Sequence, residues 1–311
     1  MSAFATERAV AIDAVLRASK ICQKVFNNLI TKDTIIKGDK TPVTIADFSA
    51  QAVINTILYK SFPNDPIVGE ENSKKMQGDS EEKKEMRNKI LSLANSVLDT
   101  HLNEKELLDS IDRGNCSGAH MKVRMWTVDP VDGTKGFIRG GNYAVGISLI
   151  IDGEVHLSVI GCPNFLVNFK EPESKKGCLF IAVKGQEALI CESFVAKNPS
   201  LAKIASILGI TKEPLHIDSN MCKYCAVARG GADIYLRLHP IAIDFEEKIW
   251  DHAPGYLLIK EAGGMVADMD NKPFRFYFRK QLKTNRGIVV ASPKIYEQVV
   301  CAVQQTITKE I

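Results

Sequence analysis

The stretch DPVDGTKGF, residues 129–137, follows VRMWTV, a run with the pattern of a β-strand. Its two carboxylates, Asp129 and Asp132, flank a proline. Asp-Pro and Asp-Gly are common turn dipeptides, so one interpretation is an ordinary surface turn. The other is a site for metal and phosphate. Both carboxylates and the Val131 carbonyl can face one point as oxygen ligands for Mg²⁺. Gly133, which has no Cβ, lets the backbone approach a phosphate.

The residues after this turn could bind an anion. The amides of Gly133 and Thr134 open a predicted short helix, TKGFI, and N–H groups at the start of a helix favour negative charge. The Thr134 hydroxyl lies beside the carboxylates and could orient a water molecule. The stretch thus brings a cation site, an anion site and a hydroxyl within a few residues of one another.

Other carboxylates stand at the ends of predicted elements. Asp47 begins a helix after the loop KTPVTIA, Glu70 and Glu71 end a short strand, and Asp251 begins the helix of WDHAPGYLLIKEAGG. Each has a purely structural alternative. Thr44 and Asp47 can form a capping box, Asp251 can be an N-cap, and the strand-end acids can be solvated charges. Together these carboxylates are enough to surround a hard cation.

The composition is that of a soluble globular protein large enough for two domains. The 311 residues are 45% hydrophobic and 25% charged. A net charge of +3 provides no electrostatic footprint for nucleic acid or a membrane surface. The N-terminus does not resemble a secretory signal, and no apolar run reaches the roughly 18 residues that span a bilayer. We expect a cytoplasmic protein that acts on a small molecule, and we expect it to be a monomer.

Eight cysteines are scattered along the chain, several of them within apolar runs, which is typical of buried, reduced thiols. Cys222 and Cys225 form a C-x-x-C pair that could be a redox or zinc site. No second pair and no histidine has the matching zinc-ligand spacing. We interpret the two as ordinary thiols on a helix.

Hydrophobic periodicity predicts an α/β (α+β) chain in two parts. The segment near 162–175 is rich in Pro, Glu and Lys, and we place the boundary there, between residues 165 and 166. Helices are expected over 5–30, 47–61, a segment ending near 98, 104–111, 200–208, 221–230, 252–262 and 294–307. Asp152-Gly153 predicts a β-hairpin, and residues 178–190 a second one. Further strands are expected over 214–217, 233–237, 265–268 and 287–291.

Four ordered motifs resemble those of the Mg²⁺-dependent, Li⁺-sensitive phosphatase superfamily. They are TPVTIAD (41–47), VGEE (68–71), DPVDGT (129–134) and WDHAPGYLLIKEAGG (250–264). The superfamily includes inositol monophosphatases, inositol polyphosphate 1-phosphatases and fructose 1,6-bisphosphatases. The resemblance covers nearly the whole chain and implies a layered α-β-α-β-α sandwich.

The resemblance also implies a role for each motif residue. The ligands of two or three Mg²⁺ ions would be Glu70, Asp129, the Val131 carbonyl, Asp132 and Asp251. Asp47 and Thr134 would take a proton from the attacking water, and the amides of Gly133 and Thr134 would bind the phosphoryl group. Residues 1–165 would form an α+β part with the antiparallel sheet and most metal ligands. Residues 166–311 would form an α/β part with the nucleotide-recognition residues.

A narrower resemblance concerns the substrate. TPVTIADFSAQ, GCPN, KYCAVARGGADIYLRL and EKIWDHAPG are similar to segments of the 3′(2′),5′-bisphosphate nucleotidases of fungi and plants. This implies hydrolysis of 3′-phosphoadenosine 5′-phosphate (PAP) to AMP and phosphate, with its 5′-phosphosulfate analogue as a further candidate substrate, and with inhibition by Li⁺ and Na⁺. Ser219, Lys223 and Arg237 match positions that contact the nucleotide and its 5′-phosphate. Lys223 and Arg237 could instead be ordinary surface charges.

Two other functions stay open from the sequence. One is an inositol polyphosphate 1-phosphatase, and the other is a non-catalytic nucleotide sensor on the same fold. A sensor is expected to have lost Asp47, Glu70 or Thr134. All three are present, which favours an enzyme.

Overall fold

The chain folds into a mixed set of helices and strands. A computed structural model describes residues 4–31, 41–116, 124–166, 173, 175–185, 199–211, 217–238, 247–276, 280–282 and 287–307. Its elements are α1 (Ala5–Thr31), α2 (Thr41–Ser61), β1 (Ile67–Gly69), the 3₁₀ helix η1 (Ser73–Met76), α3 (Glu81–Asn95), α4 (Glu104–Asp112), β2 (Met125–Asp132), α5 (Thr134–Ile138), β3 (Ala144–Ile151), β4 (Glu154–Leu166), β5 (Lys176–Val183), α6 (Pro199–Ile207), α7 (Asn220–Ala228), β6 (Ile234–Leu238), α8 (Ile249–Glu261), β7 (Met265–Ala267), β8 (Gly287–Ala291) and α9 (Tyr296–Ile307).

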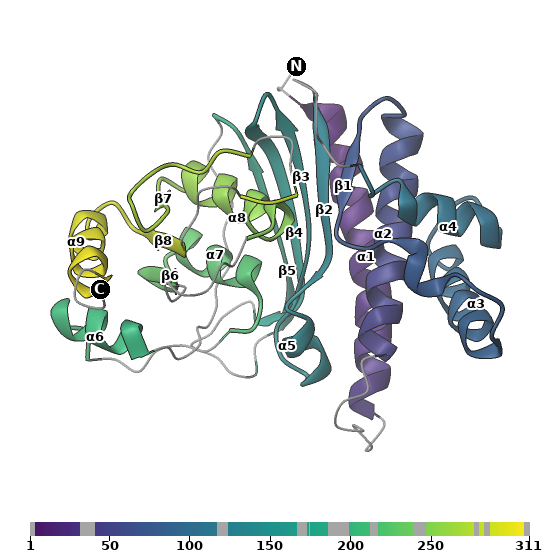
Figure 1. The fold of residues 1–311 in the computed structure, drawn as a ribbon, viewed down its shortest axis with the longest axis horizontal. Helices are drawn as coiled ribbons and strands as arrows, with labels where there is room; N and C mark the ends of the chain where they lie inside the picture. The colour runs from purple at the N-terminus through teal and green to yellow at the C-terminus, as the bar shows by residue number, and fades with distance from the viewer. Residues whose placement is uncertain are drawn as a thin grey trace.

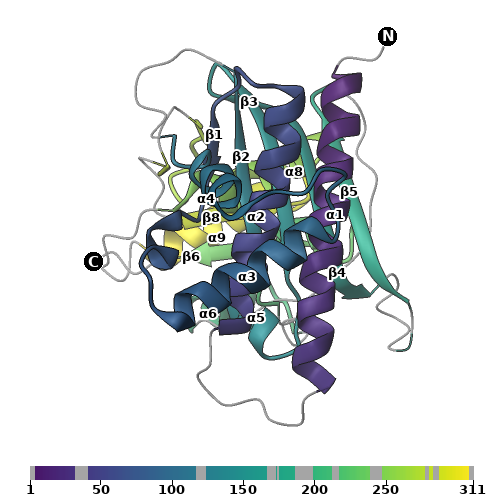
Figure 2. The same cartoon turned by 90° about the vertical axis from the view of Figure 1, so that its right-hand side faces the viewer.

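Helix layers and sheet layers alternate through the molecule (Figure 1). A five-stranded sheet of order β1-β2-β3-β4-β5 is covered by α1 and α2 on one face and by α7 and α8 on the other. Beyond α7 and α8 lie a three-stranded sheet of order β6-β8-β7 and then α6 and α9. Figure 2 shows α1 and α2 in front of the larger sheet, with α3 outside them. The predicted α-β-α-β-α sandwich is confirmed.

The larger sheet is buried on both faces, which explains the nearly continuous apolar sequence of β3, AVGISLII. Alternate residues of β3 pack on opposite sides. Val145, Ile147 and Leu149 join the core beneath α1 and α2, whereas Ala144 and Ile150 join the core beneath α7 and α8. The sheet therefore separates two hydrophobic cores and contributes side chains to both.

The predicted hairpin at Asp152-Gly153 is confirmed. Both residues have positive φ, at 51° for Asp152 and 79° for Gly153, as a two-residue turn between twisted strands requires. The predicted strand 214–217 and the second strand of the hairpin over 178–190 lie almost wholly outside the described residues. The domain boundary at residue 165 stays a prediction, and β5, which follows it, pairs with β4 of the larger sheet.

Two helix starts differ from the prediction. α2 begins at Thr41, not at Asp47, so the expected loop and the Thr44–Asp47 capping box are wrong. Pro42 is tolerated there because the first turn of a helix does not need its N–H. α8 begins at Ile249 with Lys248 as its N-cap residue, so Asp251 lies within the first turn and is not the cap.

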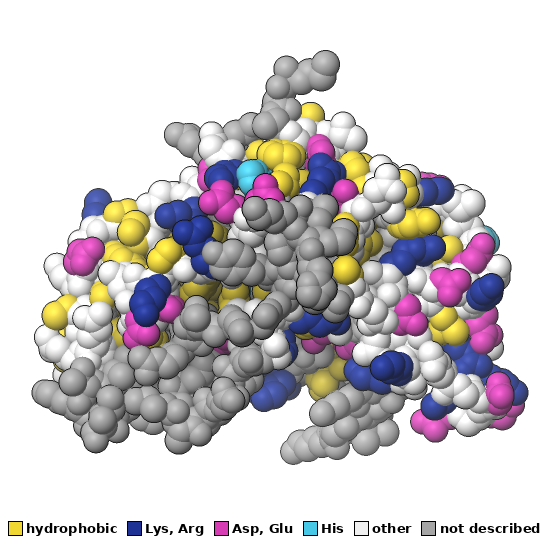
Figure 3. Space-filling view, turned by 45° about the horizontal axis from the view of Figure 1, so that its top comes forward, with side chains coloured by type: hydrophobic (Ala, Val, Ile, Leu, Met, Phe, Trp, Pro, Cys, Tyr) yellow, Lys and Arg dark blue, Asp and Glu magenta, His cyan; other side chains and the backbone are white. Residues whose placement is uncertain are grey.

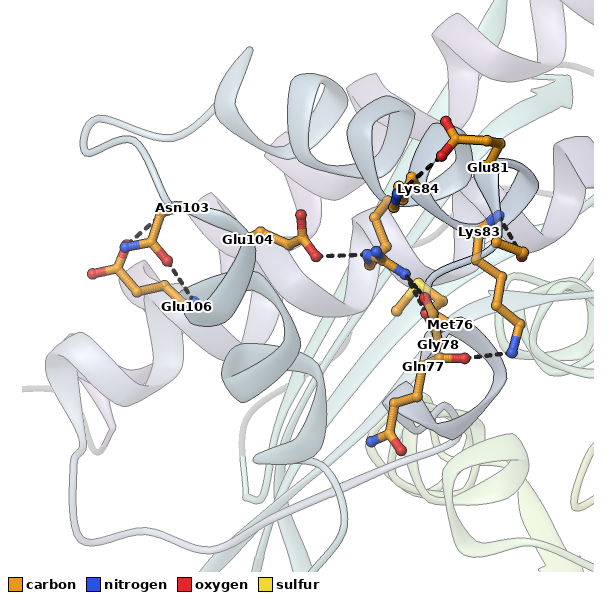
Figure 4. Close-up of polar contacts among 11 residues, drawn as sticks. Met76, Gln77, Gly78, Glu81, Lys83, Lys84, Asn103, Glu104 and Glu106 are labelled. Carbon is orange, nitrogen blue, oxygen red and sulfur yellow. Dashed lines mark hydrogen bonds and ion pairs between the residues drawn. The ribbon is translucent and has the colours of Figure 1, made fainter.

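Outside α2, a buried arginine joins η1, α3 and α4 (Figure 4). The Arg87 guanidinium donates to the Glu104 carboxylate at 2.7 Å and to the carbonyls of Met76 and Gly78 at 2.7 and 2.8 Å. A capping box between Asn103 and Glu106 begins α4. These contacts hold η1, α3 and α4 together, and α3 and α4 in turn pack on α2, the helix that carries Asp47.

Charges of both signs are interspersed over the described residues on the face drawn in Figure 3. This agrees with the small net charge of +3. Within the described part of the chain, no helix combines the length and apolar character that crossing a bilayer would require.

Candidate active site

A β-bulge in β2 turns Asp129 and Asp132 toward the same side of the sheet. In a regular strand, residues three apart point to opposite faces. Asp129 pairs with Gly146 of β3, but Asp132 pairs with Ala144, so β2 holds one extra residue between them. A proline in this interval cannot donate to the ladder, which favours the irregularity. The bulge therefore converts two acids on opposite faces into a pair.

Asp251 and Glu70 complete a group of carboxylates around this bulge. Carboxylate oxygens of Asp129, Asp132 and Asp251 all lie within 4.8 Å of one another, with Asp251 supplied by the first turn of α8. β1 runs parallel to β2 with Gly69 beside Val128, so the next residue, Glu70, lies beside Asp129, and their side chains hydrogen-bond. Three elements thus bring four acids to one point.

Burial and mutual repulsion make these carboxylates reluctant to ionise. Burial, followed by the charges of Glu70 and Asp132, raises the pKa of Asp129 well above its usual range. Burial and the charge of Asp251 raise the pKa of Asp132 to about 6. Glu70 has an exposed surface, yet the protein atoms around its carboxylate and then the charge of Asp251 raise its pKa to about 8. We take Glu70 to lie at the open side of the group.

The group has the chemistry of a site for a hard cation. Asp129 is 1% exposed, and its Oδ1 has no hydrogen-bond partner among the described residues. A buried oxygen without a partner costs free energy that a bound cation would recover. Oxygen ligands without Cys or His favour Mg²⁺ over softer metals. The residues present therefore fit the predicted metal.

Other contacts orient the acids. The Asp132 Oδ2 accepts a hydrogen bond from the Ser219 hydroxyl and another, of 2.6 Å, from the Met221 amide. These donors belong to the start of α7, where Ser219 is the N-cap residue and accepts from the Cys222 amide at 3.0 Å. Asp132 is thus anchored to a helix terminus, which supplies partial positive charge.

A buried amide that no sequence pattern indicates, the side chain of Gln51, holds the backbone of the strand-end acids in place. Its side chain exchanges two hydrogen bonds with the Glu71 backbone, at 2.9 and 2.7 Å. The Glu71 carboxylate in turn pairs with Lys75 at 3.0 Å, whereas Glu70 faces the acidic group. Gln51 lies four residues after Asp47 in an apolar helix, a position that carries no distinguishing pattern.

Asp47 and Thr134 approach the group from α2 and α5, two helices that pack on each other. Asp47 is buried, and burial followed by the charges of Glu70 and Glu71 raises its pKa well above the usual range. Thr134 is exposed at the first position of α5. Among the described residues no hydrogen bond joins Asp47 to Thr134, so their predicted relay stays a prediction.

The predicted nucleotide-binding residues lie beside the acids but differ in access. Ser219 is fully buried, and its hydroxyl serves Asp132. Lys223 is half-buried and lies 5.5 Å from the centre of the Tyr235 ring. Burial lowers the pKa of Lys223, although Asp132 opposes the shift. The Arg237 side chain is 28% exposed. Contact of these three residues with a nucleotide stays a prediction.

Arg237 belongs to a buried polar network that the sequence did not suggest. Its Nε donates to Glu247 at 2.6 Å, and the other Glu247 oxygen lies 2.8 Å from Nε2 of His252. His252 Nδ1 in turn lies 3.1 Å from the Tyr224 hydroxyl. Burial alone would raise the pKa of Glu247, but the hydrogen bonds and charges of His252 and Arg237 hold it well below its usual range. Side-chain N or O atoms of Glu247, His252 and Asp251 lie within 4.8 Å of one another, so the network adjoins the carboxylate group.

Gly133 is required by the geometry at the end of β2. Its φ is +91°, and an added Cβ would lie 2.9 Å from the Ser219 Cβ and 3.1 Å from the Asn142 carbonyl oxygen. The absence of a side chain lets the start of α5 lie close to the start of α7. The sequence predicted a close approach at Gly133 too, but of the backbone to a phosphate.

Gly133→Ala is therefore expected to destabilise the protein by about 1–3 kcal/mol more than Gly263→Ala does. Gly263 is the matched control because it also has positive φ, at 76°, but has nothing within 4 Å of an added Cβ. Urea unfolding of both variants measures the difference. Equal losses would show that the close approach to Ser219 has no energetic consequence.

The cysteines do not form a metal or disulfide site within the described part of the chain. The seven cysteines described there are free, and no cysteine belongs to a potential metal-binding group. Cys222 and Cys225 are buried on α7, and burial raises the pKa of both thiols. Their interpretation as ordinary thiols is consistent with this arrangement.

This chain is similar to a family model, to the sequences of known proteins and to solved structures. The model of the inositol monophosphatase family matches residues 5–308. A 3′(2′),5′-bisphosphate nucleotidase of Schizosaccharomyces pombe is 39% identical over 99% of this chain and 97% of that protein. One of Dictyostelium discoideum is 34% identical over 96% and 97%. The fold is shared with inositol monophosphatase II of Staphylococcus aureus, at a TM-score of 0.60 and 16% identity over 97% of this chain and 94% of that one.

Proposed function

The chain belongs to the inositol monophosphatase family, and on that premise we propose that it is a 3′(2′),5′-bisphosphate nucleotidase. It removes the 3′-phosphate of PAP in a Mg²⁺-dependent reaction and releases AMP and inorganic phosphate. The 5′-phosphosulfate analogue of PAP is a second candidate substrate. The names of the curated relatives support this assignment.

The observation that supports the proposal most strongly is that acidic and cationic side chains lie next to one another at the end of β2. Asp129, Asp132 and Asp251 form a triad with an unpartnered buried oxygen. Lys223 lies close enough to Asp132 and to Arg237 for their charges to shift its pKa. A substrate with two separated phosphates can place one at a metal held by the acids and the other near the two cations.

We assign the residues of this chain to the following roles. Glu70, Asp129, Asp132, Asp251 and the Val131 carbonyl would hold two or three Mg²⁺ ions. When bound, these ions would supply Lewis-acid stabilisation of the attacking and leaving oxygens. The amides of Gly133 and Thr134 would donate to the phosphoryl oxygens. Asp47, which lies buried near Glu70 and Glu71, would take the water proton through the Thr134 hydroxyl.

Phosphate release from a panel of substrates tests the proposed function. With Mg²⁺ present, PAP is expected to have the highest kcat/KM, above the 5′-phosphosulfate analogue and inositol 1,4-bisphosphate. Preference for inositol 1,4-bisphosphate would assign the site to an inositol polyphosphate 1-phosphatase. Binding of PAP without any phosphate release would assign it to a nucleotide sensor.

Lys223→Gln is expected to raise the KM for PAP about tenfold or more, because a hydrogen bond to a charged group is worth about 1.5–3 kcal/mol. The KM for adenosine 3′-phosphate, which has no 5′-phosphate, is expected to change less than about threefold. Steady-state kinetics on the two substrates measures the split. Lys294→Gln, a change of a lysine before α9, is the control. Equal increases on both substrates would remove Lys223 from 5′-phosphate recognition.

Li⁺, and more weakly Na⁺, is expected to inhibit the reaction. Li⁺ is close to Mg²⁺ in size but has half its charge, so at the position of Asp132 and Asp251 it would stabilise a leaving oxygen less well. Initial rates at several Li⁺, Mg²⁺ and PAP concentrations, with K⁺ as the ionic-strength control, measure this effect. Identical responses to Li⁺ and K⁺ would contradict the proposed site.

The predicted cytoplasmic location, the monomeric state and the number of Mg²⁺ ions stay predictions. Each is open to direct measurement: by cell fractionation, by light scattering and by calorimetric titration.

A further inference from the structure

Asn220 lies between the carboxylate group of the site and the cation Arg237. It is the first residue of α7, and 7% of its surface is exposed. Its Oδ1 accepts hydrogen bonds from Arg237 Nη1 at 3.0 Å and from the Tyr235 hydroxyl at 3.2 Å. Its side chain also hydrogen-bonds the Asp251 carboxylate, and because this bond favours the ionised form of Asp251, the amide nitrogen is the donor. Both ends of one buried amide are therefore used.

These contacts determine the orientation of the amide. With its oxygen and nitrogen exchanged, the amide would turn N–H groups toward the Arg237 guanidinium and its oxygen toward the Asp251 carboxylate. Both contacts would be repulsive in a buried setting. Only the observed orientation satisfies a cation on one side and an anion on the other. A side chain with two acceptors, or with none, cannot do the same.

The residues joined by Asn220 come from three separate elements. Arg237 is on β6, Asp251 is in the first turn of α8, and Asn220 itself begins α7 directly after Ser219, the donor to Asp132. Glu247 holds the Nε of Arg237 but leaves its Nη1 to Asn220. A shift of Asn220 would therefore move a proposed phosphate-binding cation and a proposed metal ligand together.

We propose that Asn220 is a positioning residue that sets the spacing between Arg237 and Asp251, and so matches the site to a substrate with two phosphates. The inference rests on the proposed function for the identity of the substrate. Its effect on metal binding does not depend on that identity. Loss of the amide is expected to weaken two separable events, Mg²⁺ binding at Asp251 and recognition of the second phosphate by Arg237.

Asn220→Leu tests the proposal because leucine has a similar size and no polar atoms. Calorimetric titration is expected to show Mg²⁺ binding about tenfold weaker than in the parent. At saturating Mg²⁺, the KM for PAP is expected to rise about tenfold, and that for adenosine 3′-phosphate less than about threefold. Asn220→Ser, which leaves room for water, is the second variant if the leucine protein does not fold.

Tyr235→Phe is the matched control, since it removes one hydrogen bond to Asn220 without touching Arg237 or Asp251. It is expected to bind Mg²⁺ like the parent. If the Asn220 variants bind Mg²⁺ normally and raise both KM values equally, Asn220 supports the fold alone and the proposal is overturned. If the parent does not hydrolyse PAP, the proposed function fails, but calorimetry still decides whether Asn220 positions Asp251.

Discussion

Asp129→Asn is expected to lower kcat about 1,000-fold, since a metal ion held by this residue is worth several kcal/mol in the transition state. The same change is expected to leave the metal-free protein as stable as the parent, or more stable. Asp129 is buried among Glu70, Asp132 and Asp251, and one of its oxygens has no partner. Asparagine keeps the shape and removes an acid whose ionised form the metal-free site does not stabilise.

The opposite effects on activity and stability distinguish a functional acid from a structural one. Asp268→Asn is the control, because Asp268 is also buried but accepts hydrogen bonds from the amides of Asp270 and Lys272 in a turn after β7. Its turnover is expected to stay within about twofold of the parent. Phosphate release and urea unfolding in a chelator measure both properties. Normal turnover in Asp129→Asn would remove this residue from the site.

The turns and helices that depend on neighbouring residues alone could be predicted from the sequence. The Asp152-Gly153 turn and most helices follow from positive φ preferences and from apolar periodicity. The start of α2 was misplaced because proline at a helix start and proline in a loop have the same sequence appearance. The layered sandwich followed from the resemblance of the motifs and not from the periodicity.

The site was only partly accessible to the same reasoning. The sequence brings Asp129 and Asp132 close along the chain, but only the one-residue bulge against β3 places them on one face. Three buried polar residues act through partners on other parts of the chain: Gln51, Asn220 and Glu247. Glu247 is bonded to Arg237, 10 residues away, and Asn220 to Asp251, 31 residues away. A single buried polar residue has no periodicity, so no pattern indicates it.

Removal of Mg²⁺ is expected to abolish turnover, by about 1,000-fold or more, and to make stability depend on pH in a defined direction. Burial and neighbouring charges raise the pKa of Asp132 to about 6 and that of Glu70 to about 8. A carboxyl with a higher pKa in the folded chain takes up protons on folding. The free energy of unfolding of the metal-free protein should therefore fall as pH rises from about 4 to about 8.

Mg²⁺ should reverse this dependence, because it binds the ionised carboxylates of the folded chain and competes with protons for them. The stabilisation by Mg²⁺ is therefore expected to be larger at about pH 8 than at about pH 6. Urea midpoints across this range, with Mg²⁺ or with a chelator, measure both effects. Asp79→Asn, at an exposed position before α3, is the control and should retain the parent's dependence. A metal-free protein that becomes more stable as pH rises would mean that these acids are satisfied by the protein itself, and the carboxylate group would then be a structural feature without a place for a cation.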